Sequence, residues 1–153
     1  MSPSTSTSSP TCSRTSEEEL IESVSIPTEP FPPERTGMTF LELKRAAQTF
    51  PTVSAATSIR VDDPTADEPV VEDARIAMAN AADIPLRVED AEAHVEGGSL
   101  SDEALEAVVE TVASAVTPES EMHADRDYKE EVAGEYAKRS LETSYERAVA
   151  TEI

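Results

Sequence analysis

Beyond position 37, the hydrophobic and polar positions of the chain follow two different periods. Apolar and small residues alternate with polar ones in three stretches, 38–45, 52–61 and 70–79, and this spacing predicts three β-strands. Pro51 separates the first two stretches, and the polar segment 62–69, DDPTADEP, separates the second from the third. Short connections of this kind are typical of antiparallel strands.

The second half of the chain changes to helical spacing. A first helix is predicted over about residues 87–95, with a stop at Gly97, where the missing side chain permits a left-handed residue. A second helix follows Ser101, a favourable N-cap, and ends at Thr117-Pro118. Its apolar residues recur at helical spacing: Leu105, Val108, Val109, Val112, Ala113 and Val116. A third helix is predicted over about 125–149, and Gly134 weakens it by about 1 kcal/mol relative to alanine.

These elements predict an α+β domain over residues 37–150, in which a three-stranded antiparallel sheet packs against a layer of three helices. Residues 1–16 contain eleven serines or threonines and no acid, and we expect them to form a disordered tail. Residues 17–36 begin with a short apolar segment and continue as a proline-rich connector that we expect to be extended.

The charge of the chain narrows the range of partners. It has 32 acidic and 12 basic residues, a net charge of −20, which repels phosphate groups and argues against direct binding of nucleic acid or of anionic membranes. Leu, Ile, Val and Phe make up only about 19% of the residues, so the fold prediction rests on the periodic pattern. Such acidity is typical of halophilic proteins. Without a membrane span or a secretory signal in the sequence, we expect a cytoplasmic protein.

Few residues in the sequence are suited to catalysis. His94 and His123 have carboxylates nearby but neither the HExxH spacing nor a cysteine companion, so surface or capping histidines are the simpler interpretation. Cys12 lies in the tail, and no serine stands in a GxSxG motif. The four glycines form no glycine-rich loop that could hold a phosphate: Gly37, Gly97, Gly98 and Gly134. We therefore predict no catalytic residue and no metal site.

Three stretches resemble one protein family in the same order, and the resemblance covers residues 37–148. They are TFLELKRAAQTFPTVSAATSIRV, VEDARIAMANAADIPLRVEDAEAHVEGGSLSDEAL and DYKEEVAGEYAKRSLETSY. The second contains a strand, a turn with Pro85 and Arg87, a helix with Ala91-Glu92, and Gly97 before the next helix. The chain is similar in this region to the C-terminal domain of the flavoprotein (medium) subunit of carbon monoxide dehydrogenase, xanthine dehydrogenase and related molybdenum hydroxylases.

The resemblance implies a place in an electron-transfer complex. In the family this domain packs beside an FAD-binding domain, helps to cover the flavin, and contacts a molybdopterin subunit and an iron-sulfur subunit. Phe40 matches an aromatic residue near the flavin ring, and Lys44 and Arg45 match a basic stretch. Glu42 stands where the family usually has a basic residue. A core position for Phe40 and a solvated strand edge for the two basic residues are the alternative interpretations.

The rest of the flavoprotein is hardly represented in the sequence. The segment EEELIESVSIPTEP resembles the end of the family's FAD-binding domain, but the family's glycine-rich loops, AGGxS and TxGG, have no match. We therefore expect no cofactor on the chain itself, since FAD is held in the family by a domain absent here. One hypothesis is a non-catalytic C-terminal domain component of a molybdenum hydroxylase, and whether it counts as part of an enzyme is left open. The alternative is a freestanding acidic protein-interaction module, or a truncated remnant without activity.

The charge also predicts how folding depends on salt. Arg14 is the only charged residue among the first sixteen, so residues 17–153 carry a net charge of −21. Like charges at this density oppose compaction, and the screening length falls from about 10 Å at about 0.1 M salt to about 3 Å at about 1 M. We expect the midpoint of thermal unfolding, followed by circular dichroism, to rise steeply between these two salt concentrations. Equal midpoints would show that the charges are already compensated locally.

Overall fold

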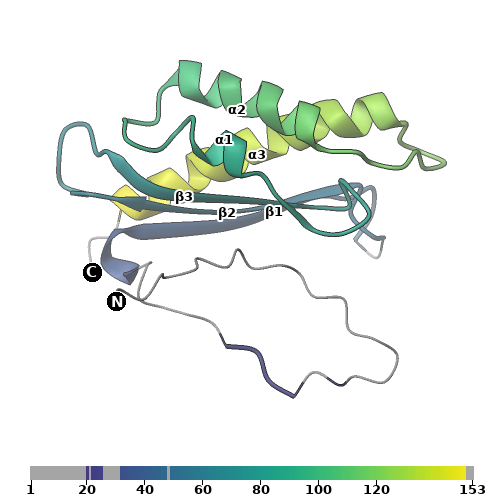
Figure 1. Ribbon diagram of the computed structural model, residues 1–153, viewed down its shortest axis with the longest axis horizontal. Coiled ribbons are helices and arrows are strands. Elements are labelled where there is room, and N and C mark those ends of the chain that lie inside the picture. Colours follow the sequence, from purple (N-terminus) through teal and green to yellow (C-terminus); the bar gives the residue numbers. More distant parts are fainter. Residues whose placement is uncertain (1–19, 21, 26–31, 48, 151–153) are drawn as a thin grey trace, which may run out of the picture.

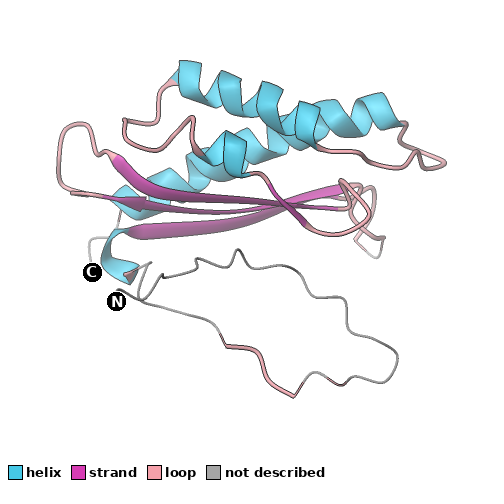
Figure 2. Ribbon diagram, viewed as in Figure 1, coloured by secondary structure: helices cyan, strands magenta, loops and turns pink. Residues whose placement is uncertain are grey.

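The computed structural model describes residues 20, 22–25, 32–47 and 49–150. The predicted tail 1–16, with Cys12, and most of the apolar segment and connector lie outside the described residues. The sheet forms one layer and the helices form the other (Figure 1, Figure 2), which confirms the α+β class. The elements in chain order are η1 (Pro33–Arg35), β1 (Thr36–Leu43), β2 (Val53–Val61), β3 (Val71–Ala79), β4 (Leu86–Arg87), α1 (Glu89–Glu92), α2 (Asp102–Ala115) and α3 (Arg126–Val149).

The sheet is antiparallel, with the strand order β1-β2-β3-β4. Thr57 of β2 pairs with Thr39 of β1 on one side and with Ile76 of β3 on the other, so the three long strands are neighbours in sequence and in space. These are the three strands that the alternating pattern predicts. The fourth strand, Leu86–Arg87, pairs with the end of β3 and was not predicted, because two residues are too few to show an alternation.

One face of the sheet forms the core together with the helices. α3 lies across β1 and β2, and α2 packs on α3. Valine and alanine dominate this core, and their small volume allows sheet and helices to approach closely. Its central residues are Val53, Ala55, Ile59, Val61, Ala74, Ile76, Met78, Leu105, Val108, Val112, Ala133, Ala137 and Leu141.

Two glycines permit the close packing of α3. A Cβ atom at Gly37 would lie 1.8 Å from the backbone oxygen of Ser144, so only glycine fits at this point of β1. Nearby, the buried hydroxyl of Thr57 lies 2.7 Å from Ser144 Oγ. Where α3 meets α2, a Cβ atom at Gly134 would lie 2.6 Å from the carbonyl oxygen of Val109. The glycine that weakens α3 as an isolated helix is therefore required for its packing, because alanine would force the two helices apart.

The outer edge of β3 is closed by β4, by backbone hydrogen bonds from the segment around α1, and by two side chains of that segment. Glu92 Oε1 accepts a hydrogen bond of 2.9 Å from the N–H of Ile76, and Glu96 Oε1 accepts one of 3.0 Å from the N–H of Ala74. A strand edge with unpaired N–H groups is open to pairing with other chains. The two carboxylates satisfy these groups where β4 does not reach.

Arg87 holds Glu92 in this position. Its Nε and Nη2 atoms donate to Oε1 and Oε2 of Glu92 at 2.9 and 2.7 Å, and the pair raises the pKa of the arginine. The helix predicted over 87–95 is accordingly shorter, because Leu86–Arg87 join the sheet and α1 covers only Glu89–Glu92. The chain continues in turns to Gly97, whose φ of 82° confirms the predicted left-handed stop.

The two long helices agree with the prediction at their starts. Ser101 Oγ accepts a hydrogen bond of 3.2 Å from the N–H of Ala104, which makes Ser101 the N-cap of α2. Asp125 caps α3 in the same way through the N–H of Tyr128. The extended connector is a wrong prediction over Pro33–Arg35, which form the 3₁₀ turn η1. Proline suits the first position of a helical turn, where an N–H group would have no acceptor.

We expect the substitution Glu92→Ala to lower the free energy of unfolding by about 3 kcal/mol, because it removes the acceptor of both Arg87 and the Ile76 N–H. Glu89→Ala is the matched control. Glu89 also pairs with Arg87, but its side chain is 63% exposed against 4% for Glu92. Its loss should therefore cost less than about 0.5 kcal/mol. Urea denaturation of both variants measures the difference, and equal losses would contradict this role of Glu92.

Candidate functional site

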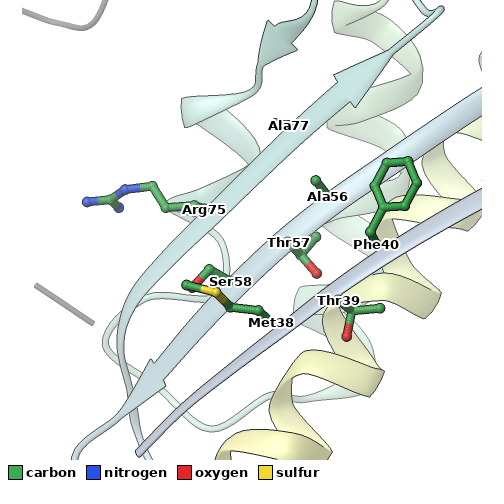
Figure 3. Close-up of a pocket in the computed structure, with 8 residues that line it drawn as sticks. All are labelled: Met38, Thr39, Phe40, Ala56, Thr57, Ser58, Arg75 and Ala77. Carbon is green, nitrogen blue, oxygen red and sulfur yellow. The ribbon is translucent and has the colours of Figure 1, made fainter. Parts of the chain in front are cut away.

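No helix or strand among the described residues covers the second face of the sheet (Figure 1), and a shallow hollow lies there. Its volume is about 400 Å³. All three long strands contribute to it (Figure 3). The lining residues are Met38, Thr39, Phe40, Ala56, Thr57, Ser58, Arg75 and Ala77.

The strand register determines which side chains face the hollow. Successive residues of a strand point to opposite faces, and Phe40, Ala56 and Ala77 are register neighbours on the open face. Phe40 is 61% exposed and Met38 is 56% exposed. Because the two alanines end at Cβ, the floor of the hollow is low and apolar beside the Phe40 ring (Figure 3).

Ser58 and Arg75 are the polar residues on the open face that border the hollow. Ser58 is only 9% exposed, and its hydroxyl has no hydrogen-bond partner within the described part of the chain. Met38 is its register partner on β1 and lies next to it (Figure 3). Arg75 borders the hollow on β3, points away from Phe40 (Figure 3), and pairs with Asp73. The hollow is therefore suited to an apolar group, and its lining residues offer no arrangement for acid-base chemistry.

Of the predicted cofactor-binding residues, only Phe40 lies at the hollow. Its exposure shows that the alternative of a core position for Phe40 is wrong. Lys44 and Arg45 follow the end of β1 and do not line the hollow. Lys44 forms an ion pair with Glu42, the residue that departs from the family pattern. Contact of these three predicted residues with a flavin stays a prediction.

Sequence reasoning missed most of the hollow. β2 carries small or apolar residues at its odd-numbered and at its even-numbered positions. Its pattern therefore predicts a strand but does not show which face of that strand the helices cover. The strand register is the missing information. It places Phe40 opposite Ala56 and Ala56 opposite Ala77, and the small alanine side chains beside the phenyl ring leave the hollow. Arg75 and Ser58 gave no separate signal in the sequence.

The four glycines test whether the chain fits FAD, whose pyrophosphate usually binds to a glycine-rich backbone. Gly37 and Gly134 are used in packing against α3 and α2. Gly97 donates its N–H to the carbonyl oxygen of Val71 at 2.8 Å, and Gly98 accepts from the Val71 N–H at 2.9 Å. These glycines therefore do not form a phosphate cradle, and the chain does not fit the pyrophosphate of FAD.

The two histidines lie apart from the hollow. His94 Nε2 is 3.0 Å from Thr111 Oγ1 and connects the turn after α1 with α2, while His123 is exposed in the loop before α3. The described residues contain no group of three or more His, Cys, Asp or Glu side chains that could hold a metal ion. Within the same residues, no helix combines the length and the hydrophobicity needed to cross a membrane.

A second, polar hollow of about 310 Å³ lies between the loop after β3, the loop before α3 and the first turn of α3. Lys129 is 1% exposed, and its Nζ lies 2.8 Å from Glu121 Oε1 and 3.3 Å from the carbonyl oxygen of Glu119. Asn80, with a φ of 55°, donates to the same Glu121 oxygen and to the carbonyl oxygen of Pro51. The hydrogen bonds from Lys129 and Asn80 lower the pKa of Glu121. These contacts tie the loops together, and we interpret them as structural.

The chain matches one protein family over most of its length. The sequence profile described as the CO dehydrogenase flavoprotein C-terminal domain matches residues 38–144. The carbon monoxide dehydrogenase medium chain of Hydrogenophaga pseudoflava is 30% identical over 112 residues, which are 73% of this chain and 37% of that protein. The chain thus spans little more than a third of the length of this relative.

Solved structures show the same relationship. Carbon monoxide dehydrogenase from Hydrogenophaga pseudoflava, in a form that lacks the Mo-pyranopterin moiety of the molybdenum cofactor, is 31% identical with a TM-score of 0.68, over 74% of this chain and 38% of that one. Reconstituted CO dehydrogenase from Oligotropha carboxidovorans is 27% identical with a TM-score of 0.68, over 76% and 39%. Quinoline 2-oxidoreductase from Pseudomonas putida 86 shares the fold at 18% identity, with a TM-score of 0.67 over 74% and 38%.

We expect the purified chain to bind no FAD tightly, because its glycines are used in packing and turns instead of a phosphate cradle. Incubation with excess FAD followed by gel filtration should leave the protein peak without flavin absorption. A flavoprotein carried through the same column with its FAD is the positive control. Near-stoichiometric flavin in the peak would mean that other groups of the chain hold the cofactor.

Proposed function

Because this chain belongs to the CO dehydrogenase flavoprotein C-terminal domain family, we propose that it is a non-catalytic component of a molybdenum hydroxylase flavoprotein subunit and acts by packing against other proteins. The observation that carries the proposal is the apolar face of the sheet, on which Phe40 and Met38 remain exposed. Exposed apolar patches on folded domains commonly mark interaction sites. A domain with this role needs such a face and does not need catalytic side chains.

The first partner in this proposal is an FAD-binding domain of the same family. FAD is assigned to that domain because the glycines of this chain do not fit its pyrophosphate. In this arrangement residues 37–150 are the packing domain, residues 17–36 are the connector that follows an FAD-binding domain, and residues 1–16 are a tail.

The proposal extends to a larger oxidoreductase complex. Several of the similar proteins are carbon monoxide dehydrogenases, one of them in a form that lacks the Mo-pyranopterin moiety of its molybdenum cofactor and another a Cu,Mo enzyme. A molybdopterin subunit and an iron-sulfur subunit are therefore further partners of the assembled complex. Phe40 would lie at the side that meets the flavin, with Lys44 and Arg45 at the end of the same strand.

We expect the chain to form a stable complex with an FAD-binding domain of this family encoded by a neighbouring gene. Gel filtration of the mixture in high salt should give a shared peak that carries flavin absorption. The FAD-binding domain alone and a mixture with an unrelated acidic protein are the controls. If the chain elutes alone as a monomer in every mixture, the packing role fails, and the alternative of a truncated remnant becomes the better account.

A further inference from the structure

Arg35, the last residue of η1, connects the turn before β1 to the end of β2 and the start of β3. Its Nη1 donates a hydrogen bond of 2.9 Å to Glu72 Oε2. The same nitrogen also donates to the carbonyl oxygens of Val61 and Asp62, at 3.3 and 3.4 Å. These acceptors lie 26, 27 and 37 residues further along the chain. We call Arg35 together with its three acceptors the Arg35 anchor, because one side chain ties η1 to a distant part of the sheet.

The charged acceptor of the anchor stands at an irregularity in the pairing of β2 with β3. Arg60 pairs with Asp73, whereas the next residue of β2 pairs with Val71, so within these two strands Glu72 has no register partner. Such an extra residue is a β-bulge, which bends its strand and can re-aim a side chain. The carboxylate of Glu72 reaches Arg35 and also lies 3.5 Å from Arg60 Nε. The bulge therefore supplies the acceptor, and a second arginine holds that acceptor on the sheet.

The other contacts of η1 are weaker than the anchor. A backbone hydrogen bond of 3.3 Å from the Arg35 N–H to the carbonyl oxygen of Pro32 closes the turn, and short 3₁₀ turns have poor hydrogen-bond geometry. The N-cap, Pro32, offers no side-chain cap, and none of the three residues of η1 is buried. η1 also contacts α3. The position of η1 on the domain therefore depends mainly on the Arg35 side chain.

Two prolines extend the effect of the anchor toward the connector. The proline ring fixes φ near about −65°, so Pro32 and Pro33 cannot rotate about this bond as other residues do. Pro32 has a φ of −63° and a ψ of 132°, an extended conformation directly before the turn. A turn that is fixed on the sheet therefore also fixes the direction in which the chain leaves it at Pro32.

We propose that Arg35 is a positioning residue, which makes the junction between the connector and the domain a fixed point and not a hinge. The segment before Pro32 then leaves the domain in one direction, beside the bulge at Glu72. A fixed junction limits the positions that this segment can reach, and less conformational entropy is lost when the segment packs against another surface. The inference concerns contacts within the chain, so it does not depend on the proposed function.

Relaxation of the backbone amide nitrogens, measured by NMR on the full chain, tests the anchor. Order parameters of about 0.85 mark a rigid backbone, and values below about 0.6 mark a flexible one. In the unaltered chain the amide of Glu34 should be as rigid as that of Ile59 in the sheet. Arg35→Gln should lower the value at Glu34 below about 0.6 and leave Ile59 unchanged, because it removes all three contacts. Glu72→Gln keeps the two carbonyl contacts and should give an intermediate value at Glu34.

Arg45→Gln is the matched control, since Arg45 is exposed after the end of β1 and its loss changes the net charge equally. It should leave the amide of Glu34 rigid. A flexible Glu34 in the unaltered chain would show that the junction is a hinge, and the proposal would be wrong. The proposal also fails if Glu34 stays rigid in both Arg35→Gln and Glu72→Gln. A general loss of stability would lower the order parameter of Ile59 as well, whereas the loss of the anchor changes Glu34 alone.

Discussion

Side-chain carboxylates can replace a neighbouring strand only if the distance between them matches the distance between successive N–H groups on the strand edge. The fold of this domain depends on such a match. Residues four apart in a helix lie about 6 Å apart along its axis, and N–H groups on one edge of a strand repeat every two residues, or about 6.7 Å. Glu92 and Glu96 are joined by a helical hydrogen bond between their backbones, and they reach the N–H groups of Ile76 and Ala74. Because Arg87 fixes Glu92, one ion pair connects β4, α1 and β3.

Among the described residues, the same arrangement leaves one face of the sheet uncovered. One face of the sheet is occupied by α3 and α2, and the outer edge of β3 is closed by β4 and the α1 turn. At the other edge of the sheet, Arg147 of α3 donates a hydrogen bond to the carbonyl oxygen of Met38 in β1. One backbone group of this edge strand is therefore also satisfied. What remains among the described residues is the open face, on which Phe40 and Met38 are exposed.

Signals within a few residues were sufficient to predict the long elements. Ser101 marks the start of α2, Gly97 marks the stop before it, and the alternation in β2 marks a strand. Features that depend on register or on distant segments were not predictable. β4 exists only because its two residues lie beside β3, and Lys129, which the sequence places at the start of a helix, is buried only because a loop carries Glu121 to it. The hollow at Phe40 has the same origin, since its floor comes from residues on three strands.

α3 is the last helix in the chain, yet it covers the first strands of the sheet. Ser140 and Ser144 bond Thr57 across separations of 83 and 87 residues, and Arg147 reaches Met38 across 109. Contacts between such distant residues form late, because the intervening chain must first be closed into a loop. On the ribosome, the strands therefore emerge well before the helix that covers them, and the half-made domain exposes both faces of its sheet. Partly folded chains with exposed strands are prone to aggregate, and a net charge of −20 opposes such association through mutual repulsion.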